Sequence, residues 1–247
     1  MRKPIIAGNW KMYKTAQEGV AFISQLAPQV ADVKETTMVI CAPFPALFPM
    51  TEIAKNSNIN IGAENLYWED EGAFTGEVSA PMLAAIGCTY VIIGHSERRQ
   101  YFGETDATVN KKVFAALKHN LLPIVCVGET LAEREQGVTF EVIKRQVTLG
   151  LANLTPPAWE KIIIAYEPVW AIGTGKTATP AQAQEVHAYV RNLLPKEIAP
   201  KTRILYGGSV KPDNVKELMA QADIDGGLVG GASLKVDSYV KLVKFDQ

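Results

Sequence analysis

Short apolar runs recur at fairly even spacing along the chain. They are rich in residues that favour strands, and they are continuously apolar instead of alternating with polar positions. This pattern predicts β-strands that are buried on both faces, as in parallel sheets. The eight predicted strands are Ile5–Gly8, Met38–Ala42, Ile59–Gly62, Tyr90–Ile93, Ile124–Val127, Ile162–Ala165, Ile204–Tyr206 and Gly227–Val229.

Helical patterns lie between these runs. Four are long and amphipathic: Thr15–Leu26, Thr105–Lys118, Phe140–Leu149 and Pro180–Leu194. Shorter helices are predicted at Pro45–Lys55, Ala80–Ile86, Asn214–Ala220 and Ser238–Val243. Thr179 is an expected N-cap, since a threonine there is followed by Pro180 at the first helical position.

Eight alternating strand–helix units without a composition break or linker fit an α/β fold of the closed (β/α)8 type. We therefore expect one TIM-barrel domain over residues 1–247. A doubly wound open sheet is the alternative, and it is expected to carry a glycine-rich fingerprint after its first strand. The first strand here ends in Gly8-Asn9-Trp10-Lys11, which is not that fingerprint.

Polar residues stand at the expected carboxyl ends of several strands, where barrels of this type carry their active sites. The barrel prediction implies that these residues converge. They are Asn9, Lys11, Glu64, Asn65, His95, Ser96, Glu97, Glu129, Glu167, Ser209, Gly230 and Gly231.

Overall charge narrows the choice of ligand. The net charge is −1 and the chain has no basic block, so no global field attracts nucleic acid or an acidic membrane. Any bound anion must be held by local groups. Three cysteines without a close pair, and three histidines without metal-ligand spacing, favour neither disulfides nor a metal site. With no signal-peptide pattern and no apolar run long enough for a bilayer, we expect a cytoplasmic protein.

Glu167 is the strongest candidate for catalysis. It follows an apolar strand, so its carboxylate points into the mouth of a barrel, and the alternative role is a structural ion pair. The loop after it starts stiffly at Pro168, has an apolar, glycine-bearing tip and ends in small residues. Such a loop suits a lid that closes over a ligand and excludes water. We therefore interpret Glu167 as a catalytic base.

His95 and Lys11 are further candidates at strand ends. His95 stands where a strand gives way to a predicted helical turn with Ser96 near its start, and a helix N-terminus disfavours the imidazolium form. A neutral histidine there could donate a hydrogen bond to a carbonyl group. Lys11 would be a fixed positive charge beside an anionic substrate, and Asn9 could orient a substrate oxygen or Lys11 itself.

Two glycine clusters favour phosphate binding. Tyr206-Gly207-Gly208-Ser209 follows the seventh strand, and Val229-Gly230-Gly231-Ala232-Ser233 follows the eighth. Backbone amides at these two places form the usual phosphate site of such barrels, and glycine lets the backbone approach the anion. Ordinary tight turns are the alternative.

The stretch Ala63–Ser79 is long for a connection within a compact domain. It contains Tyr67, Trp68 and Phe74. Aromatic side chains on a long loop suggest a partner surface, whereas the alternative is a loop that folds back on its own barrel.

Six ordered segments together resemble the triosephosphate isomerase family over essentially the full chain. They are Gly8-Asn9-Trp10-Lys11, Gly72-Ala73-Phe74-Thr75-Gly76-Glu77, Gly94-His95-Ser96-Glu97-Arg98-Arg99, Tyr166-Glu167-Pro168-Val169-Trp170 with Ala171-Ile172-Gly173-Thr174-Gly175, Tyr206-Gly207-Gly208-Ser209-Val210, and Leu228-Val229-Gly230-Gly231-Ala232-Ser233.

The resemblance implies interconversion of dihydroxyacetone phosphate and D-glyceraldehyde 3-phosphate, a step of glycolysis and gluconeogenesis. Glu167 would remove a carbon-bound proton and return it to the neighbouring carbon, while neutral His95 would polarise the carbonyl. This family is itself the standard example of that pairing. Lys11 would stabilise negative charge, and Asn9 would help to place the substrate.

Further roles follow from the same resemblance. Ser96 would hold Glu167 in the open state, and Glu97 would pair with Lys11. The closed lid would hinder loss of phosphate, and no metal ion or organic cofactor is implied. The phosphate would be held by backbone amides of Gly173, Ser209, Gly230 and Gly231.

The long loop, with Phe74 and Thr75, resembles the family's interface loop, which inserts into the other subunit and implies a homodimer. Family members usually have glutamine where this chain has Glu64. A carboxylate buried at that interface is costly unless it is protonated or paired. We expect Glu64→Gln to stabilise the dimer, most clearly at high pH.

Two other functions remain to be distinguished. Another sugar-phosphate barrel enzyme, an isomerase or an aldolase, is one; a Schiff-base aldolase would need a lysine where Glu167 stands. A noncatalytic dimeric binding barrel is the other, and it predicts that changing Glu167 leaves turnover unaffected.

Overall fold

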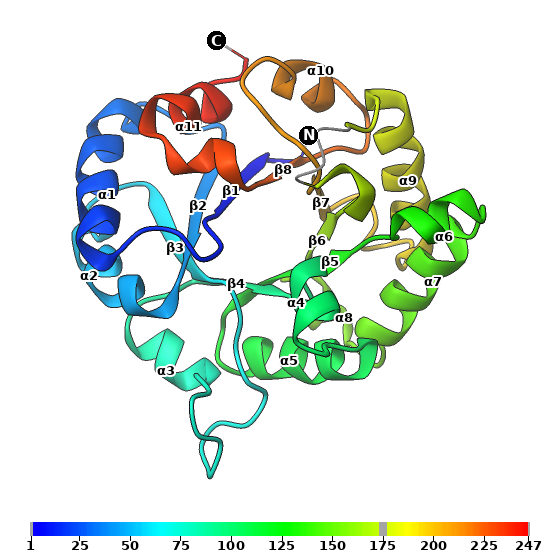
Figure 1. The fold of residues 1–247 in the computed structure, drawn as a ribbon, viewed down its shortest axis with the longest axis horizontal. Coiled ribbons are helices and arrows are strands. Elements are labelled where there is room, and N and C mark those ends of the chain that lie inside the picture. Colours follow the sequence, from blue (N-terminus) through cyan, green and yellow to red (C-terminus); the bar gives the residue numbers. More distant parts are fainter. Residues whose placement is uncertain (1, 173–176, 247) are drawn as a thin grey trace.

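The computed structural model describes residues 2–172 and 177–246. Eight parallel strands follow one another in chain order and close into a barrel, with helices around the outside (Figure 1). All eight predicted strands are confirmed within one or two residues. Their bounds are β1 Ile5–Asn9, β2 Thr37–Ala42, β3 Ile59–Ala63, β4 Tyr90–Ile93, β5 Leu122–Val127, β6 Ile163–Tyr166, β7 Arg203–Tyr206 and β8 Gly226–Val229.

Closure is made by β1, which pairs with β2 on one side and with β8 on the other. Alternate residues of each strand then face different cores. Ile5 and Ala7 belong to a cluster inside the barrel, whereas Ile6 packs in the larger cluster between barrel and helices. Both faces of the sheet are therefore buried, which is why the strands are continuously apolar.

Helices cover the outer face of the barrel. The eight predicted helices are present with small shifts at their ends, of which the largest extends α1 to Val30. Thr179 caps α9, because its side chain accepts a hydrogen bond from the backbone N–H of Gln182. The helix bounds are α1 Ala16–Val30, α2 Phe44–Ala54, α3 Ala80–Ala85, α4 Ser96–Tyr101, α5 Asp106–Lys118, α6 Leu131–Glu135, α7 Thr139–Gly150, α8 Pro156–Trp159, α9 Pro180–Leu193, α10 Val215–Met219 and α11 Val236–Val243, with 3-10 turns η1 Val169–Ala171 and η2 Gly231–Leu234.

The connection between β3 and α3 projects away from the barrel (Figure 1). Its two ends meet at a bridge between Tyr67 and Ser79, and its aromatic rings pack on one another, with Tyr67 against Trp68 at 4.1 Å and against Phe74 at 4.7 Å between centroids. The loop is therefore held by its own side chains and presents its tip to solvent instead of folding onto its own barrel.

Within the described ranges, every helix is too short or too polar to cross a lipid bilayer.

Candidate active site

The residues predicted at the carboxyl ends of the strands converge at one mouth of the barrel. A cavity of about 640 Å³ lies there. The residues of the prediction that line it are Asn9, Lys11, His95, Glu167, Ser209, Gly230 and Gly231. Residue Gly173, assigned to phosphate binding from the sequence, lies outside the described residues.

The side chain of Glu167 is almost fully buried and faces His95 and Ser96. Its Oε1 lies 2.8 Å from Nε2 of His95. The backbone N–H of Ser96 donates to Oε2 at 2.9 Å, and the hydroxyl of Ser96 donates to Oε1 at 3.3 Å. The contact with Ser96 that the resemblance implies is therefore present.

The charge on Glu167 is set by opposing effects. Burial raises the pKa of its carboxyl group, but the adjacent imidazole of His95 and the hydrogen bonds from His95 and Ser96 outweigh burial. The pKa of Glu167 consequently lies below its ordinary value, and the group is an ionised base in this arrangement.

His95 forms the N-cap of α4, and the N–H of Glu97 donates to its Nδ1 at 3.3 Å. Nε2 is therefore the nitrogen that carries a proton toward Glu167. Burial lowers the pKa of His95, but the Glu167 carboxylate raises it, and the net shift is upward. This raised pKa differs from the neutral imidazole expected from the helix N-terminus alone, because that expectation did not include the Glu167 carboxylate 2.8 Å away.

Lys11 has an unusual backbone conformation, with φ of 56°, which L-residues other than asparagine and aspartate rarely adopt. Oδ1 of Asn9 accepts a hydrogen bond from the N–H of Lys11 at 3.2 Å and supports this turn. The ammonium group of Lys11 lies 2.5 Å from Oε1 of Glu97, as the resemblance implies. The strained turn thus directs the lysine into the mouth of the barrel.

The two glycine clusters line the same cavity as His95. Ser209 follows β7, while Gly230 and Gly231 lead from β8 into η2. The hydroxyl of Ser233 donates to the carbonyl of Gly230 at 2.7 Å and fixes this turn. Gly230 also approaches Lys11, because a Cβ placed on it would lie 3.7 Å from Cε of Lys11. An anion held here is therefore close to the lysine.

Glu129 stood among the strand-end residues of the sequence, but no role was assigned to it. Its side chain is completely buried, and its Oε1 accepts hydrogen bonds from Tyr166 at 3.1 Å and from Nε1 of Trp170 at 2.8 Å. Arg134 also donates to it at 3.1 Å. Glu129 therefore anchors the start of the loop after Glu167. The only signal for this anchoring role in the sequence is the presence of an acidic residue at the end of a strand.

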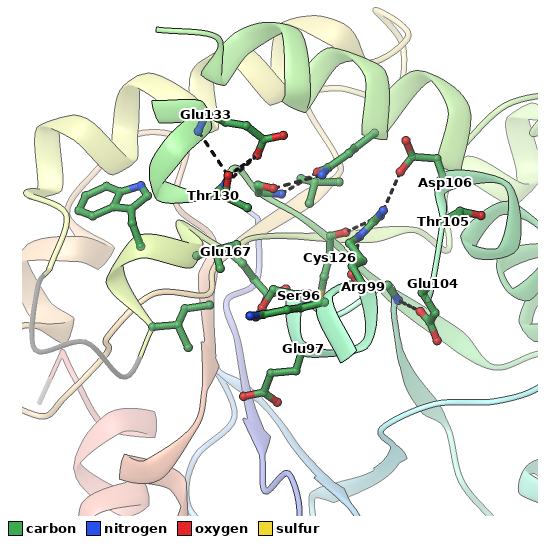
Figure 2. Close-up of a pocket in the computed structure, with 18 of the residues that line it drawn as sticks. Ser96, Glu97, Arg99, Glu104, Thr105, Asp106, Cys126, Thr130, Glu133 and Glu167 are labelled. Carbon is green, nitrogen blue, oxygen red and sulfur yellow. Dashed lines mark hydrogen bonds and ion pairs between the residues drawn. The ribbon is translucent and has the colours of Figure 1, made fainter. Parts of the chain in front are cut away.

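A second cavity, of about 880 Å³, lies on the other side of Glu167, between α4, α6 and η1. In Figure 2, Thr130 and Glu133 lie on one side of Glu167 and Glu97 lies on the other. The cavity is lined by Glu167, Cys126, Gly128, Gln146 and Trp170 among others.

A third, smaller cavity of about 320 Å³ adjoins the active site and includes Asn9, Lys11, His95 and Glu64 in its lining. Oε1 of Glu64 is buried and has no hydrogen-bond partner within the described part of the chain. Phe74 and Thr75 are not among its lining residues and belong to the connection between β3 and α3, which projects from the barrel in Figure 1.

A closed (β/α)8 barrel with a carboxylate, an imidazole and a lysine beside phosphate-type loops defines an enzyme of the sugar-phosphate class that works by proton transfer. The family model for triosephosphate isomerase matches residues 4–246. Triosephosphate isomerases from Endomicrobium trichonymphae and Moorella thermoacetica are 58% and 59% identical to the chain, and each match covers 100% of both proteins.

Structural comparison agrees. The crystal structure of triosephosphate isomerase from Bartonella henselae matches with a TM-score of 0.91 and 39% identity, covering 99% of this chain and 100% of that one. The chain belongs to the triosephosphate isomerase family, whose members are intramolecular aldose–ketose isomerases. The aldolase alternative is not favoured, because Glu167 stands where the Schiff-base lysine would have to be.

Proposed function

We propose that Glu167 and His95 carry out the family's reaction in this chain, the interconversion of dihydroxyacetone phosphate and D-glyceraldehyde 3-phosphate through an enediolate. The observation that carries this proposal is the approach of the Glu167 carboxylate to within 2.8 Å of the His95 imidazole, at a cavity shared with the phosphate-type loops. A base and a hydrogen-bond donor beside an anion site are the groups that this reaction needs.

Glu167 acts as the base. Its carboxylate turns from Ser96 toward the substrate, takes the proton from the carbon next to the carbonyl and returns it to the neighbouring carbon. The electron pair of the broken C–H bond forms the enediolate double bond, and negative charge passes to the carbonyl oxygen. The low pKa of Glu167 in the resting state supports an ionised base before the substrate binds.

His95 acts as the donor to the enediolate oxygens. Once Glu167 leaves Nε2, the largest of the charges that raise the pKa of His95 is removed and only Glu97 still raises it, so burial and the charge of Lys11 favour the neutral imidazole. The N–H of Glu97 on Nδ1 keeps the remaining proton on Nε2. Nε2 gives this proton to the former carbonyl oxygen and takes up the hydroxyl proton of the neighbouring oxygen, whose carbon becomes the new carbonyl, so His95 returns to its starting form. The movement of Glu167 therefore brings the base to the substrate and makes His95 a neutral hydrogen-bond donor at the same time.

The substrate is held by local charge and by backbone amides. Lys11 balances the charge of the phosphate and the enediolate, Asn9 places the substrate, and Glu97 orients Lys11 through the 2.5 Å ion pair. The phosphate is held by amides of Gly173, Ser209, Gly230 and Gly231. Binding by such local groups suits a protein whose net charge is −1 and which has no global field to attract an anion.

The loop that begins at Pro168 acts as a lid. The start of this loop is anchored by Glu129, whose carboxylate accepts a hydrogen bond from Trp170. Closure of the loop over the substrate excludes water and hinders loss of phosphate from the enediolate. The proposed reaction uses side chains and backbone amides alone and calls for neither a metal ion nor a cofactor.

The active protein is a homodimer in which the projecting loop of one subunit enters the 320 Å³ cavity beside the active site of the other. Support comes from exposed apolar side chains on the loop and around the cavity, including Phe74 at 41%, Phe102 at 67% and Met12 at 95% exposure. We further propose one domain over residues 1–247, in the cytoplasm, serving glycolysis and gluconeogenesis.

A coupled assay of glyceraldehyde 3-phosphate isomerisation tests the proposal. Glu167→Gln should lower kcat by several orders of magnitude, on the order of 10³-fold or more, with a modest change in KM, because proton transfer is lost while binding remains. The control is Glu135→Gln, which changes an exposed carboxylate at the end of α6. Turnover of Glu167→Gln equal to that of the control would show that Glu167 is not the base.

A further inference from the structure

We propose that Gln146, on α7, is a positioning residue that holds the backbone of Glu167 in place for proton transfer. The proposal rests on the role of Glu167 given above and extends it to a residue that does not contact the substrate. Gln146 acts through Gly128, the residue that follows β5.

Gln146 is a buried amide on a helix face that is mainly apolar. It is 5% exposed, and Val142, Ile143 and Val147 are buried on the same helix. Burying an amide is costly unless its hydrogen bonds are made. The amide of Gln146 makes two hydrogen bonds, and both are to Gly128. The N–H of Gly128 donates to Oε1 at 2.7 Å, and Nε2 donates to the carbonyl of Gly128 at 3.1 Å. The side chain therefore clamps the backbone of Gly128.

Gly128 in turn lies directly against the backbone of Glu167. A Cβ on Gly128 would overlap with the carbonyl oxygen of Glu167, so only glycine fits here. The neighbouring peptides are hydrogen-bonded as well: Glu167 donates to the carbonyl of Val127 at 2.7 Å, and Val169 donates to the carbonyl of Glu129 at 3.1 Å. A displacement of Gly128 must therefore be transmitted to Glu167.

The second cavity explains why this support is needed. Gly128, Gln146 and Glu167 all line the 880 Å³ space shown in Figure 2, so packed side chains do not fill the region beside this stretch of backbone. The hydrogen bonds of Gln146 supply the restraint that close packing supplies elsewhere. Both the base and the first residue of the lid, Pro168, start from the backbone that is held in this way.

Replacing Gln146 by leucine removes both hydrogen bonds at similar volume. We expect kcat to fall on the order of 10- to 100-fold with little change in KM, since a displacement of about 1 Å at a reacting group has effects of this size. Inhibition by inorganic phosphate should change much less than kcat, because Ser209, Gly230 and Gly231 follow β7 and β8, which Gln146 does not contact. Affinity for a phosphorylated hydroxamate that mimics the enediolate should fall with kcat/KM.

The matched control is Gln184→Leu on α9. Gln184 also clamps a loop residue, since it donates to the Asp223 carboxylate at 2.6 Å and accepts from the Asp223 N–H at 3.0 Å. Asp223 precedes β8 and therefore lies at the opposite end of the barrel from the active site. The control should lose thermal stability but retain kcat.

Gln146→Glu provides a readout that a purely structural role does not give. A protonated carboxyl group at this position can accept from the Gly128 N–H and donate to its carbonyl, as glutamine does, whereas an ionised one repels the carbonyl. Burial raises the pKa of such a group. The ratio of variant to wild-type kcat should therefore be near one at low pH and fall as pH rises, while the ratio for Gln146→Leu stays constant.

Wild-type kcat in Gln146→Leu, or a pH-independent ratio in Gln146→Glu, would overturn the positioning role. The carboxyl variant keeps the size of glutamine and, when protonated, one acceptor and one donor, so it tests the proposal even where leucine prevents folding. Failure of the inference is distinguishable from failure of the proposed function. In the first case Glu167→Gln still abolishes turnover; in the second case Glu167→Gln itself remains active.

Discussion

Glu64 is a carboxylic acid at a position where its ionisation is opposed. Its Oε1 is buried without a partner in the described part of the chain, and burial raises its pKa to about 8. The hydrogen bond from the Lys11 backbone lowers the pKa and nearby Glu97 raises it, but burial is the largest effect. An amide of the same shape would avoid the cost of ionisation altogether.

Glu64→Gln should therefore stabilise the protein in a pH-dependent way. The pKa of this glutamate is about 4.3 in an unfolded chain. Between that value and about 8 the folded state retains a proton that the unfolded state has released, so the wild type loses stability as pH rises through this window. We expect little gain at pH 4.5 and a gain on the order of a few kcal/mol above pH 8, measured by thermal or urea unfolding.

The control for this comparison is Glu69→Gln, which changes an exposed side chain on the same loop. A gain in Glu64→Gln that is the same at pH 5 and at pH 9 would contradict the explanation, because a packing effect does not depend on ionisation.

Residue types at strand ends were sufficient to predict most of the site. Glu167, His95 and Lys11 could be found because a barrel brings the carboxyl ends of all its strands to one mouth. The distance between Glu167 and His95 could not be predicted from the sequence, and neither could the effect of Glu167 on the pKa of His95. Gln146 was also missed, because in the sequence it is one polar residue in an amphipathic helix, and its partner Gly128 is 18 residues away.

At the scale of elements, a buried ionic cluster holds α4 and α5 to the barrel. Glu104 lies between these helices and accepts hydrogen bonds from Lys112, from Arg98 at 2.6 Å and from the N–H of Gly94 at 3.1 Å. Lys112 also donates to Asn65 at 2.7 Å. Because Gly94 precedes His95, this cluster fixes the strand end that carries His95.

Removing one charge from this cluster should be strongly destabilising. In Lys112→Met the carboxylate of Glu104, 8% exposed as a residue, loses its closest partner but keeps Arg98, so the loss should lie at the lower end of the roughly 3–5 kcal/mol that breaking a buried pair costs. The control is Lys118→Met on the same helix, whose ion pair with Asp70 is 65% exposed on the lysine side and should contribute little to stability. Denaturant unfolding measures both, and equal losses would contradict the cluster's role.

Most elements were predictable from the sequence for a physical reason. The strands are buried on both faces and so are continuously apolar, and the long helices have one buried face and so are periodic. By contrast α6 and α8, with five and four residues, are too short to show a helical period. Their positions depend on capping and on contacts with neighbouring helices.

At the scale of the whole molecule, apolar side chains remain exposed near the active-site mouth and on the projecting loop. The loop is rigidly built: Tyr67 packs on both Trp68 and Phe74, and the bridge between Tyr67 and Ser79 closes its base. Rigidity lowers the entropic cost of inserting the tip into a second subunit. A preformed apolar tip and a small cavity beside the active site are the two halves of the proposed interface.

Phe74→Lys tests this interface directly. A charge at the tip should oppose insertion, so we expect a monomer in sedimentation or light scattering at concentrations where the wild type is a dimer. The kcat should fall as well, because the cavity that the tip is proposed to fill is lined by Asn9, Lys11 and His95. The control is Phe114→Lys on α5, since Phe114 is exposed to nearly the same extent, 42% against 41%. A Phe74→Lys protein that remains a fully active dimer would exclude insertion of the loop, whereas loss of the dimer in both variants would indicate that the interface includes α5. Dissociation and loss of turnover in Phe74→Lys alone would show that this loop completes the catalytic mouth of the other subunit.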